Sequence, residues 1–242
     1  MAERGQWVTG LSLGMAGRRP LTPAEQRQLI RIARRLPARD GALITAQLMS
    51  GFRIAEVLSL TVGSVMRNGE LSTKIGIAPR NMKGGYGRTR WVPVVPELRR
   101  ALSRHLNCMR TRWELTPDLP LFLSRQVTAD GNARSITTEM ARLIMHHAFS
   151  RAGIENDGRL GTHSLRKAWA RNTYEACGKD ICLLRAALNH SDVSISQRYL
   201  EVNAEELEAA MRAVDFTRGP RRRSKHLNVV PIMPESTIAM AG

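Results

Sequence analysis

The sequence predicts a mainly α-helical protein with a small antiparallel β-sheet. Apolar residues recur at helical spacing through most of residues 21–216. Between Gly69 and Val95 the pattern changes to β-branched residues around a Gly84-Gly85 turn, which is typical of short antiparallel strands. The chain has 242 residues, and its 43% hydrophobic and 24% charged residues are ordinary for a folded protein. These proportions exclude a disulfide-stapled miniprotein and a wholly disordered chain.

The first helix has clear start signals. Thr22 is placed to cap it, Pro23 suits its first turn, and Glu25 follows the cap by three residues, as in a capping box. The apolar face of the same helix then carries Leu29, Ile30, Ala33 and Leu36.

Turn residues divide the rest of the chain into further elements. Gly51 interrupts a helix expected at residues 42–50, which resumes after it, and Asn68-Gly69 marks a turn before the strands. The remaining helices are expected at residues 96–113, 135–152, 162–177 and 180–189 and, after a turn at 190–194, on to about residue 214.

The charge balance indicates a polyanionic partner. Lys and Arg total 37 against 21 Asp and Glu, so the net charge is +16 and the pI is near 11.2. Nucleic acid fits this charge better than a membrane surface, because no segment is long and apolar enough to anchor in a bilayer. We expect a cytoplasmic, nucleoid-associated protein with a flexible basic arm at residues 1–20, one folded domain at 21–216 and a basic, disordered tail at 217–242.

The sequence offers no pattern for a metal or nucleotide cofactor. The cysteines are odd in number, form no CxxC pair and fall in apolar helical segments, so we expect reduced thiols that pack in the protein. No GxxxxGK[ST] loop is present, and His105, His146, His147 and His226 have no useful ligand spacing. The cysteines concerned are Cys108, Cys177 and Cys182.

A helix start at residues 161–166 carries a candidate anion site. Thr162 is expected as the N-cap, and the i, i+3 spacing puts His163 and Arg166 on one face of the first turns. A phosphate there would also meet the free N–H groups and the positive end of the helix dipole. The alternative is a surface His and Arg on a basic protein.

Two further segments carry candidate residues. Arg53 and Glu56 share a helix face, so Glu56 could hold Arg53 beside a phosphate, or the two could form an exposed ion pair of little energy. His190 ends one helix and Tyr199 lies in the next, where the two could converge. A tyrosine with a pKa near ~10 needs a cationic surround to act as a nucleophile; the alternative is that Tyr199 packs against its neighbouring helix.

The order of these motifs resembles the tyrosine recombinases of the phage integrase family. The resemblance covers about residues 21–211. Its motifs are, in order, Gly-Phe-Arg-x-x-Glu, a Lys in a hairpin, His-x-Leu-Arg, Leu-Asn-His-Ser-Asp and a Tyr nine residues after the His of the last motif. The resemblance implies the tyrosine recombinase catalytic-domain fold for residues 21–216. It also implies that two arginines clamp the scissile phosphate, two histidines assist, a lysine is the general acid and the tyrosine attacks, with an acidic residue in support. Carried over in that order, these residues are Arg53 and Arg166, His163 and His190, Lys83, Tyr199 and Glu56.

The sequence departs from the family pattern at several positions. The loop between Lys83 and the Arg-x-Val-Pro strand is longer than usual, which leaves Lys74 or Arg88 as alternatives for the general acid. Asn189 stands where the family most often has Gly. Lys167 replaces a common His after the second arginine.

The resemblance further implies site-specific recombination of duplex DNA by integration, excision, inversion or resolution. The intermediate would be a 3′-phosphotyrosine, with no cofactor and no metal. We expect a homo-tetramer on paired DNA sites, a monomer or dimer when free, and a possible accessory DNA-binding protein. Arg53 stands near the start of the chain, so we expect a short form without the usual core-binding domain, similar to fimbrial-switch invertases. The alternative is a cut-down catalytic fragment. The alternatives are a type IB topoisomerase-like nicking-closing enzyme and a non-catalytic DNA-binding regulator.

Overall fold

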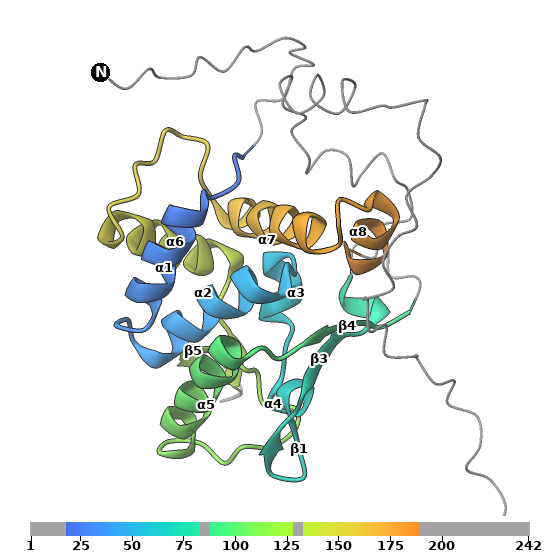
Figure 1. Ribbon diagram of the computed structural model, residues 1–242. Helices are drawn as coiled ribbons and strands as arrows, with labels where there is room; N and C mark the ends of the chain where they lie inside the picture. Colours follow the sequence, from blue (N-terminus) through green and yellow to red (C-terminus); the bar gives the residue numbers. More distant parts are fainter. Residues whose placement is uncertain (1–17, 83–87, 128–132, 189–242) are drawn as a thin grey trace, which may run out of the picture. The chain divides into compact units, whose positions relative to one another are not determined.

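The computed structural model describes residues 18–82, 88–127 and 133–188 of the chain (Figure 1). In these ranges the structure is mainly helical and contains three two-stranded antiparallel sheets, which confirms the predicted fold class. No helix within the same ranges is long and apolar enough to cross a bilayer.

Helix α1 (Pro23–Ala33) begins as its sequence predicts. The Thr22 hydroxyl accepts a hydrogen bond from the Glu25 amide at 3.2 Å, and the Glu25 carboxylate accepts one from the Thr22 amide at 2.7 Å. This reciprocal pair satisfies two of the N–H groups that a helix start leaves without partners. The inward residues Leu29 and Ala33 are buried.

Helix α2 (Ala38–Ser50) is the central helix of the described core. It is buried from Gly41 to Leu48 and packs against α1 and several later helices (Figure 1). It begins four residues earlier than predicted, because Arg39 and Asp40 obscure the apolar period at its start. A Cβ at Gly41 would lie 2.2 Å from the Ala33 carbonyl oxygen, so this position allows α1 and α2 to approach closely.

Two short helices after α2, the first within the predicted helical continuation, lead into the predicted β region. α3 (Ile54–Leu58) and α4 (Val62–Val65) lead into β1 (Met66–Arg67) and β2 (Glu70–Leu71), which pair across the predicted Asn68-Gly69 turn, where both residues have positive φ. β3 (Lys74–Ile77) pairs antiparallel with β4 (Arg90–Pro93), and a 3-10 turn, η1 (Pro79–Asn81), follows β3. Ile75 lies opposite Val92, and both side chains are buried.

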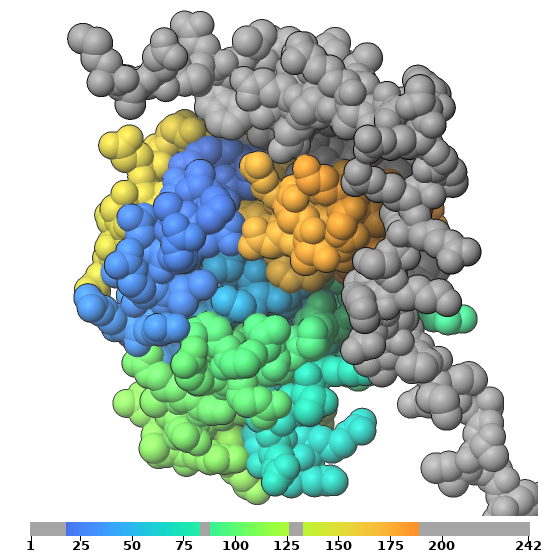
Figure 2. All heavy atoms as spheres, in the orientation of Figure 1, coloured from blue at the N-terminus to red at the C-terminus, as the bar shows by residue number. Residues whose placement is uncertain are grey.

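Helix α5 (Pro96–Arg110) lies at the surface next to the first part of the described chain, as the adjoining green and blue areas of Figure 2 show. Its inner face, which includes buried Leu98 and Leu102, packs against α2. On the outside, the Arg34 guanidinium at the end of α1 pairs with the Glu97 carboxylate of α5 at 2.7 Å. Apolar packing and an exposed ion pair thus both join α5 to the first two helices.

One hairpin was absent from the prediction. β5 (Leu123–Val127) and β6 (Ala133–Ser135) lie between α5 and α6 (Thr138–Arg151). β6 ends at Ser135, the residue that was expected to start the next helix, so the predicted start at Ser135 is wrong. That helix begins after Thr137, whose hydroxyl accepts a hydrogen bond from the Met140 amide at 3.1 Å. The strands are short and largely polar, which explains why periodicity did not reveal them.

The last two described helices agree with their predicted positions. α7 (Thr162–Ala176) packs against α2, and α8 (Ile181–Leu188) packs against α7 through Ala170, Leu184 and Leu188. The predicted turn and helix at residues 190–214 fall outside the part of the chain that the structure describes.

The junction with the predicted N-terminal arm is held by hydrogen bonds. Arg18 donates to the carbonyls of Gly158 and Leu160, and Arg19 pairs with the Glu25 carboxylate at 2.7 Å. These contacts bind residues 18 and 19 to the loop that precedes α7 and to the start of α1. The other residues of the arm before Arg18, and all of the predicted tail, are not among the described residues.

The expectation for the cysteines is wrong in one respect. All three are free thiols, but Cys108 and Cys182 are exposed and Cys177 is half-buried, so they do not pack in the core. Each of the two exposed cysteines lies on the outer face of its helix, whereas the buried face is formed by other residues, such as Met109 in α5 and Leu184 in α8.

Candidate functional site

The turn at the end of α2 determines where the first motif arginine lies. Gly51 adopts φ +61°, and a Cβ there would lie 2.3 Å from the Trp169 ring on α7. A residue with a side chain would therefore be strained by its backbone and would also clash with the indole. The turn buries Phe52 completely and makes Arg53 the N-cap of α3.

Arg53 is held by Glu56 in two ways. The Arg53 amide donates to Glu56 Oε2 at 2.7 Å, and the guanidinium Nη1 donates to Oε1 at 2.8 Å. The Glu56 side chain is only 3% exposed, whereas the Arg53 side chain is 29% exposed. The alternative of an exposed ion pair is therefore wrong: a buried carboxylate orients an arginine whose side chain remains accessible to a ligand.

Arg166 reaches the same carboxylate from α7. Its side chain is 1% exposed, and Nη1 lies 3.9 Å from Glu56 Oε2 and donates to the Gly51 carbonyl at 2.5 Å. The surface alternative is therefore wrong for Arg166. The structure brings two motif arginines that are far apart in the sequence to one buried glutamate.

A third arginine, Arg90 at the start of β4, lies in the same cluster. Its side chain is 4% exposed, and Nη1 lies 3.9 Å from Glu56 Oε2. The sequence prediction cited Arg90 only as the first residue of the Arg-x-Val-Pro strand. The missed signal is the period of two, which places Arg90 on the same buried face as Val92 while Trp91 is 59% exposed.

His163 lies at the start of α7, next to these cations. The N-cap is Gly161, so the prediction of Thr162 as the cap is wrong by one residue. The Gly161 amide donates to the Ser164 hydroxyl, which is the half of a capping box that needs no side chain at the cap residue. His163 retains solvent-exposed surface, yet surrounding atoms partly desolvate its ring, and this lowers its pKa. The positive charges of Arg166 and then Arg53 lower this pKa further.

The charges of the cluster indicate the ligand it suits. The guanidiniums of Arg53, Arg90 and Arg166 surround one carboxylate, Glu56, so positive charge is in excess at a largely buried place. An oxyanion such as a phosphate diester would offset this excess and accept hydrogen bonds from a guanidinium. Within the described ranges, no three His, Cys, Asp or Glu side chains are grouped so as to hold a metal ion.

The other predicted site residues are not part of this description. Lys83, His190 and Tyr199 lie in ranges that the structure leaves undescribed, so their roles stay predictions. The two alternatives to Lys83 are described: Lys74 on β3 and Arg88 before β4 are both exposed.

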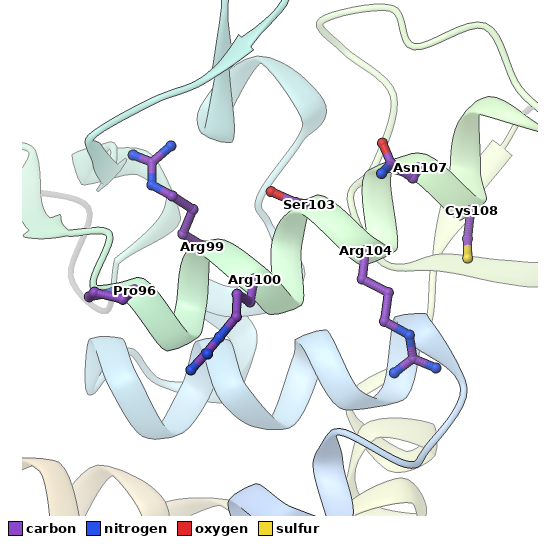
Figure 3. A pocket seen from close by; sticks show the side chains of 7 residues that line it. All are labelled: Pro96, Arg99, Arg100, Ser103, Arg104, Asn107 and Cys108. Carbon is purple, nitrogen blue, oxygen red and sulfur yellow. The ribbon is translucent and has the colours of Figure 1, made fainter.

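An open hollow of about 680 Å³ lies on α5, away from this cluster (Figure 3). Its arginines already have partners in the fold. Arg99 donates to the Leu71 and Ser72 carbonyls, Arg104 donates to the carbonyls of residues 34 and 36, and Arg100 pairs with Glu97. Among the described site residues, Arg53, Glu56, His163 and Arg166 do not line this hollow.

Comparison with known proteins assigns the fold and the motifs to one family. The model of the phage integrase family matches residues 19–206, which is most of the chain. The chain belongs to the phage integrase family. This membership covers all four described motif residues, from Arg53 to Arg166, and confirms the resemblance drawn from the order of the motifs.

Individual relatives of this phage integrase family chain are tyrosine recombinases. It is 29% identical to the tyrosine recombinase XerC of Rhodospirillum centenum over 87% of the chain and 57% of that protein. It is 33% identical to XerC of Erythrobacter litoralis over 73% of the chain and 51% of that protein. The chain thus matches little more than half the length of these relatives.

Solved structures show the same fold. The crystal structure of XerA recombinase superposes with a TM-score of 0.63 and 20% identity, covering 84% of this chain and 68% of that one. The XerH site-specific recombinase bound to its difH substrate gives a TM-score of 0.60 and 22% identity, covering 80% and 54%. The similarity to fimbrial-switch invertases stays a prediction.

Proposed function

We propose that this phage integrase family chain is a site-specific DNA recombinase that cuts and rejoins duplex DNA through a covalent tyrosine intermediate. The observation that carries the proposal is the convergence of Arg53 and Arg166 on buried Glu56, with His163 beside them. The names of the relatives support the same activity.

The described residues would bind the scissile phosphate. Arg53 would donate to its non-bridging oxygens, because Glu56 fixes the guanidinium while part of the side chain stays accessible. Arg166 would add positive charge from beneath, and His163 would donate a further hydrogen bond. Negative charge grows on the phosphate oxygens in the five-coordinate transition state, and removing one donor from such a preorganised site typically costs about 2.7–4 kcal/mol.

The chemical steps would use the three predicted residues outside the described ranges. The Tyr199 hydroxyl would pass its proton to one of the two assisting histidines, His163 or His190, and its oxygen would attack phosphorus and form the phosphotyrosine bond while the bond to the 5′ oxygen breaks. Lys83 would give that oxygen its proton, and His190 would hydrogen-bond the phosphate. One phosphoester replaces another, so rejoining requires no nucleotide cofactor.

The proposed partners are duplex DNA and further copies of the chain. The net charge of +16 suits a DNA ligand, and the XerH neighbour was solved with its difH substrate. Exchange of strands between two sites requires four protomers, so we propose a homo-tetramer on paired sites, with a monomer or dimer in the free state. The proposed partners also include an accessory DNA-binding protein.

Covalent capture tests this function and does not require that the DNA site be identified first. The probe is a random-sequence library of duplex oligonucleotides, each with one nick, so that cleavage near the nick releases a short fragment and prevents rejoining. The proposal predicts SDS-resistant complexes with the wild-type chain and none with Tyr199→Phe. Tyr174→Phe is the matched control, because Tyr174 lies on α7 among apolar neighbours and has no proposed role.

The outcomes separate the competing functions. Loss of capture in Tyr199→Phe alone supports the proposal, whereas equal capture by both variants, or none by the wild type, overturns it. A plasmid that carries two copies of the captured sequence then distinguishes the alternatives. Exchange between the copies identifies a recombinase, and relaxation without exchange indicates a nicking-closing enzyme.

A further inference from the structure

Arg90 connects β4 to the turn that carries Arg53. Its Nη2 donates to the Ser50 carbonyl at 2.9 Å, and its Nη1 donates to the Gly51 carbonyl at 3.3 Å. These two carbonyls end α2 and begin the turn before Arg53. The Gly51 carbonyl also accepts from Arg166, so two buried guanidiniums hold one peptide group.

The same guanidinium holds the end of α8. Its Nε donates to the Ala187 carbonyl at 2.8 Å. Ala187 lies in the last turn of α8 that the structure describes. His190 follows three residues later in the sequence, so this bond fixes the point from which the chain continues toward that histidine.

Aromatic and acidic groups hold Arg90 in this position. Its Cζ lies 4.8 Å from the centroid of the Phe52 ring and 5.2 Å from that of Trp169, which follows Arg166 by three residues on α7. Glu56 lies 3.9 Å away and balances part of its charge. Cation–π contacts are strongest where the cation is shielded from water, as it is here.

We infer that Arg90 is a positioning residue that fixes the Gly51 turn, the end of α8 and the strand after the Lys83 loop relative to one another. The inference rests on the proposed function, because the segments that Arg90 joins carry the residues proposed to act on one phosphate. The Arg90 side chain itself is only 4% exposed. Its planar fork of N–H donors reaches three carbonyls on two segments at once, which the single ammonium of a lysine cannot do.

A matched control exists on α5. Arg104 also donates to two backbone carbonyls of another segment, those of Arg34 and Leu36, but it lies away from Glu56. Arg104→Met therefore removes the same kind of structural contact without touching the cluster. The test compares Arg90→Met and Arg90→Lys with this control.

The first measurement is the rate of covalent complex formation on the nicked duplex that the wild type captures best. Protein is in excess, and the temperature is well below each variant's unfolding midpoint. We expect both Arg90 variants to react about 10- to 100-fold more slowly, since a misplacement of about 1 Å can cost that much. DNA affinity should change less than threefold, and Arg104→Met should react as the wild type does.

The second measurement is hydrogen exchange of the free protein, which needs no activity. We expect peptides covering residues 50–58 and 181–188 to exchange faster together in Arg90→Met and to keep wild-type rates in Arg104→Met. Three results would overturn the inference. The first is that fully folded Arg90→Met reacts at the wild-type rate, and the second is that Arg90→Lys keeps full activity. The third is that hydrogen exchange is unchanged in both peptides. If the wild type captures no DNA while the two peptides still loosen together, the proposed function fails and the structural link between the segments stands.

Discussion

Replacing Glu56 with Gln should strongly destabilise the fold. The substitution keeps the shape of the side chain but removes the charge that three guanidiniums share, at a position only 3% exposed. Removing one partner of a buried ion pair typically costs about 3–5 kcal/mol, because the remaining charges stay buried without compensation. For a domain of this size each kcal/mol lowers the unfolding midpoint by about 2–4 °C, so Glu56→Gln should melt about 6–20 °C below the wild type.

Glu97→Gln is the control for this experiment. Glu97 also contacts two arginines, Arg34 and Arg100; its own side chain is 14% exposed, but the two arginine side chains are 55% and 68% exposed. Solvent screens such pairs, so Glu97→Gln should change the midpoint little. Thermal unfolding followed by circular dichroism compares both variants at one salt concentration. A fall of less than about 2 °C in the unfolding midpoint of Glu56→Gln would refute the reasoning, because it would mean that losing the shared buried carboxylate costs less than about 1 kcal/mol.

Three further predictions address the backbone turn, the histidines and the phosphate clamp. Gly51→Ala should lower the unfolding midpoint more than Gly69→Ala in the same melting assay. Both glycines have positive φ, but of the two only Gly51 would place the new Cβ 2.3 Å from a ring, that of Trp169. Equal falls in the midpoint would refute the clash with Trp169. Burial is the main cause that lowers the pKa of both His105 and His163 in the folded state, so the unfolded chain binds more protons below about pH 6.5. Thermal melts should therefore show a higher unfolding midpoint at pH 7.5 than at pH 5.5. His105→Gln should reduce this difference between the two midpoints, and an unchanged difference would count against the assignment. Arg53→Ala should slow covalent complex formation on the captured duplex by about 10²–10³-fold, as loss of one preorganised donor does elsewhere, and a wild-type rate would exclude Arg53 from the clamp.

Local chemistry explains what could be predicted from the sequence. The capping box of α1 and the Arg53–Glu56 pair depend on residues three apart on one helix, where spacing fixes the geometry. The turns at Asn68-Gly69 and Gly51 could be predicted for a similarly local reason, because their residues have positive φ values that few residue types other than Gly and Asn adopt.

Long-range packing explains what could not be predicted. No local pattern shows that Arg166 would donate to the Gly51 carbonyl, and only the resemblance to a family placed it with Arg53. Burial of Glu56 depends on α7 and β4 as well as on its own helix. Arg90 was overlooked because an arginine in a strand pattern suggests a solvent-facing position, whereas here carbonyls and aromatic rings surround it.

The measurement that tests the central claim most directly is identification of the residue that carries DNA after capture. Covalent complexes are digested with nuclease and protease, and mass spectrometry locates the nucleotide adduct on the peptide. The account predicts a 3′-phosphate linked to Tyr199, with a free 5′-hydroxyl on the released strand. An adduct on another residue, a 5′ linkage, or DNA cleavage without any adduct would contradict it.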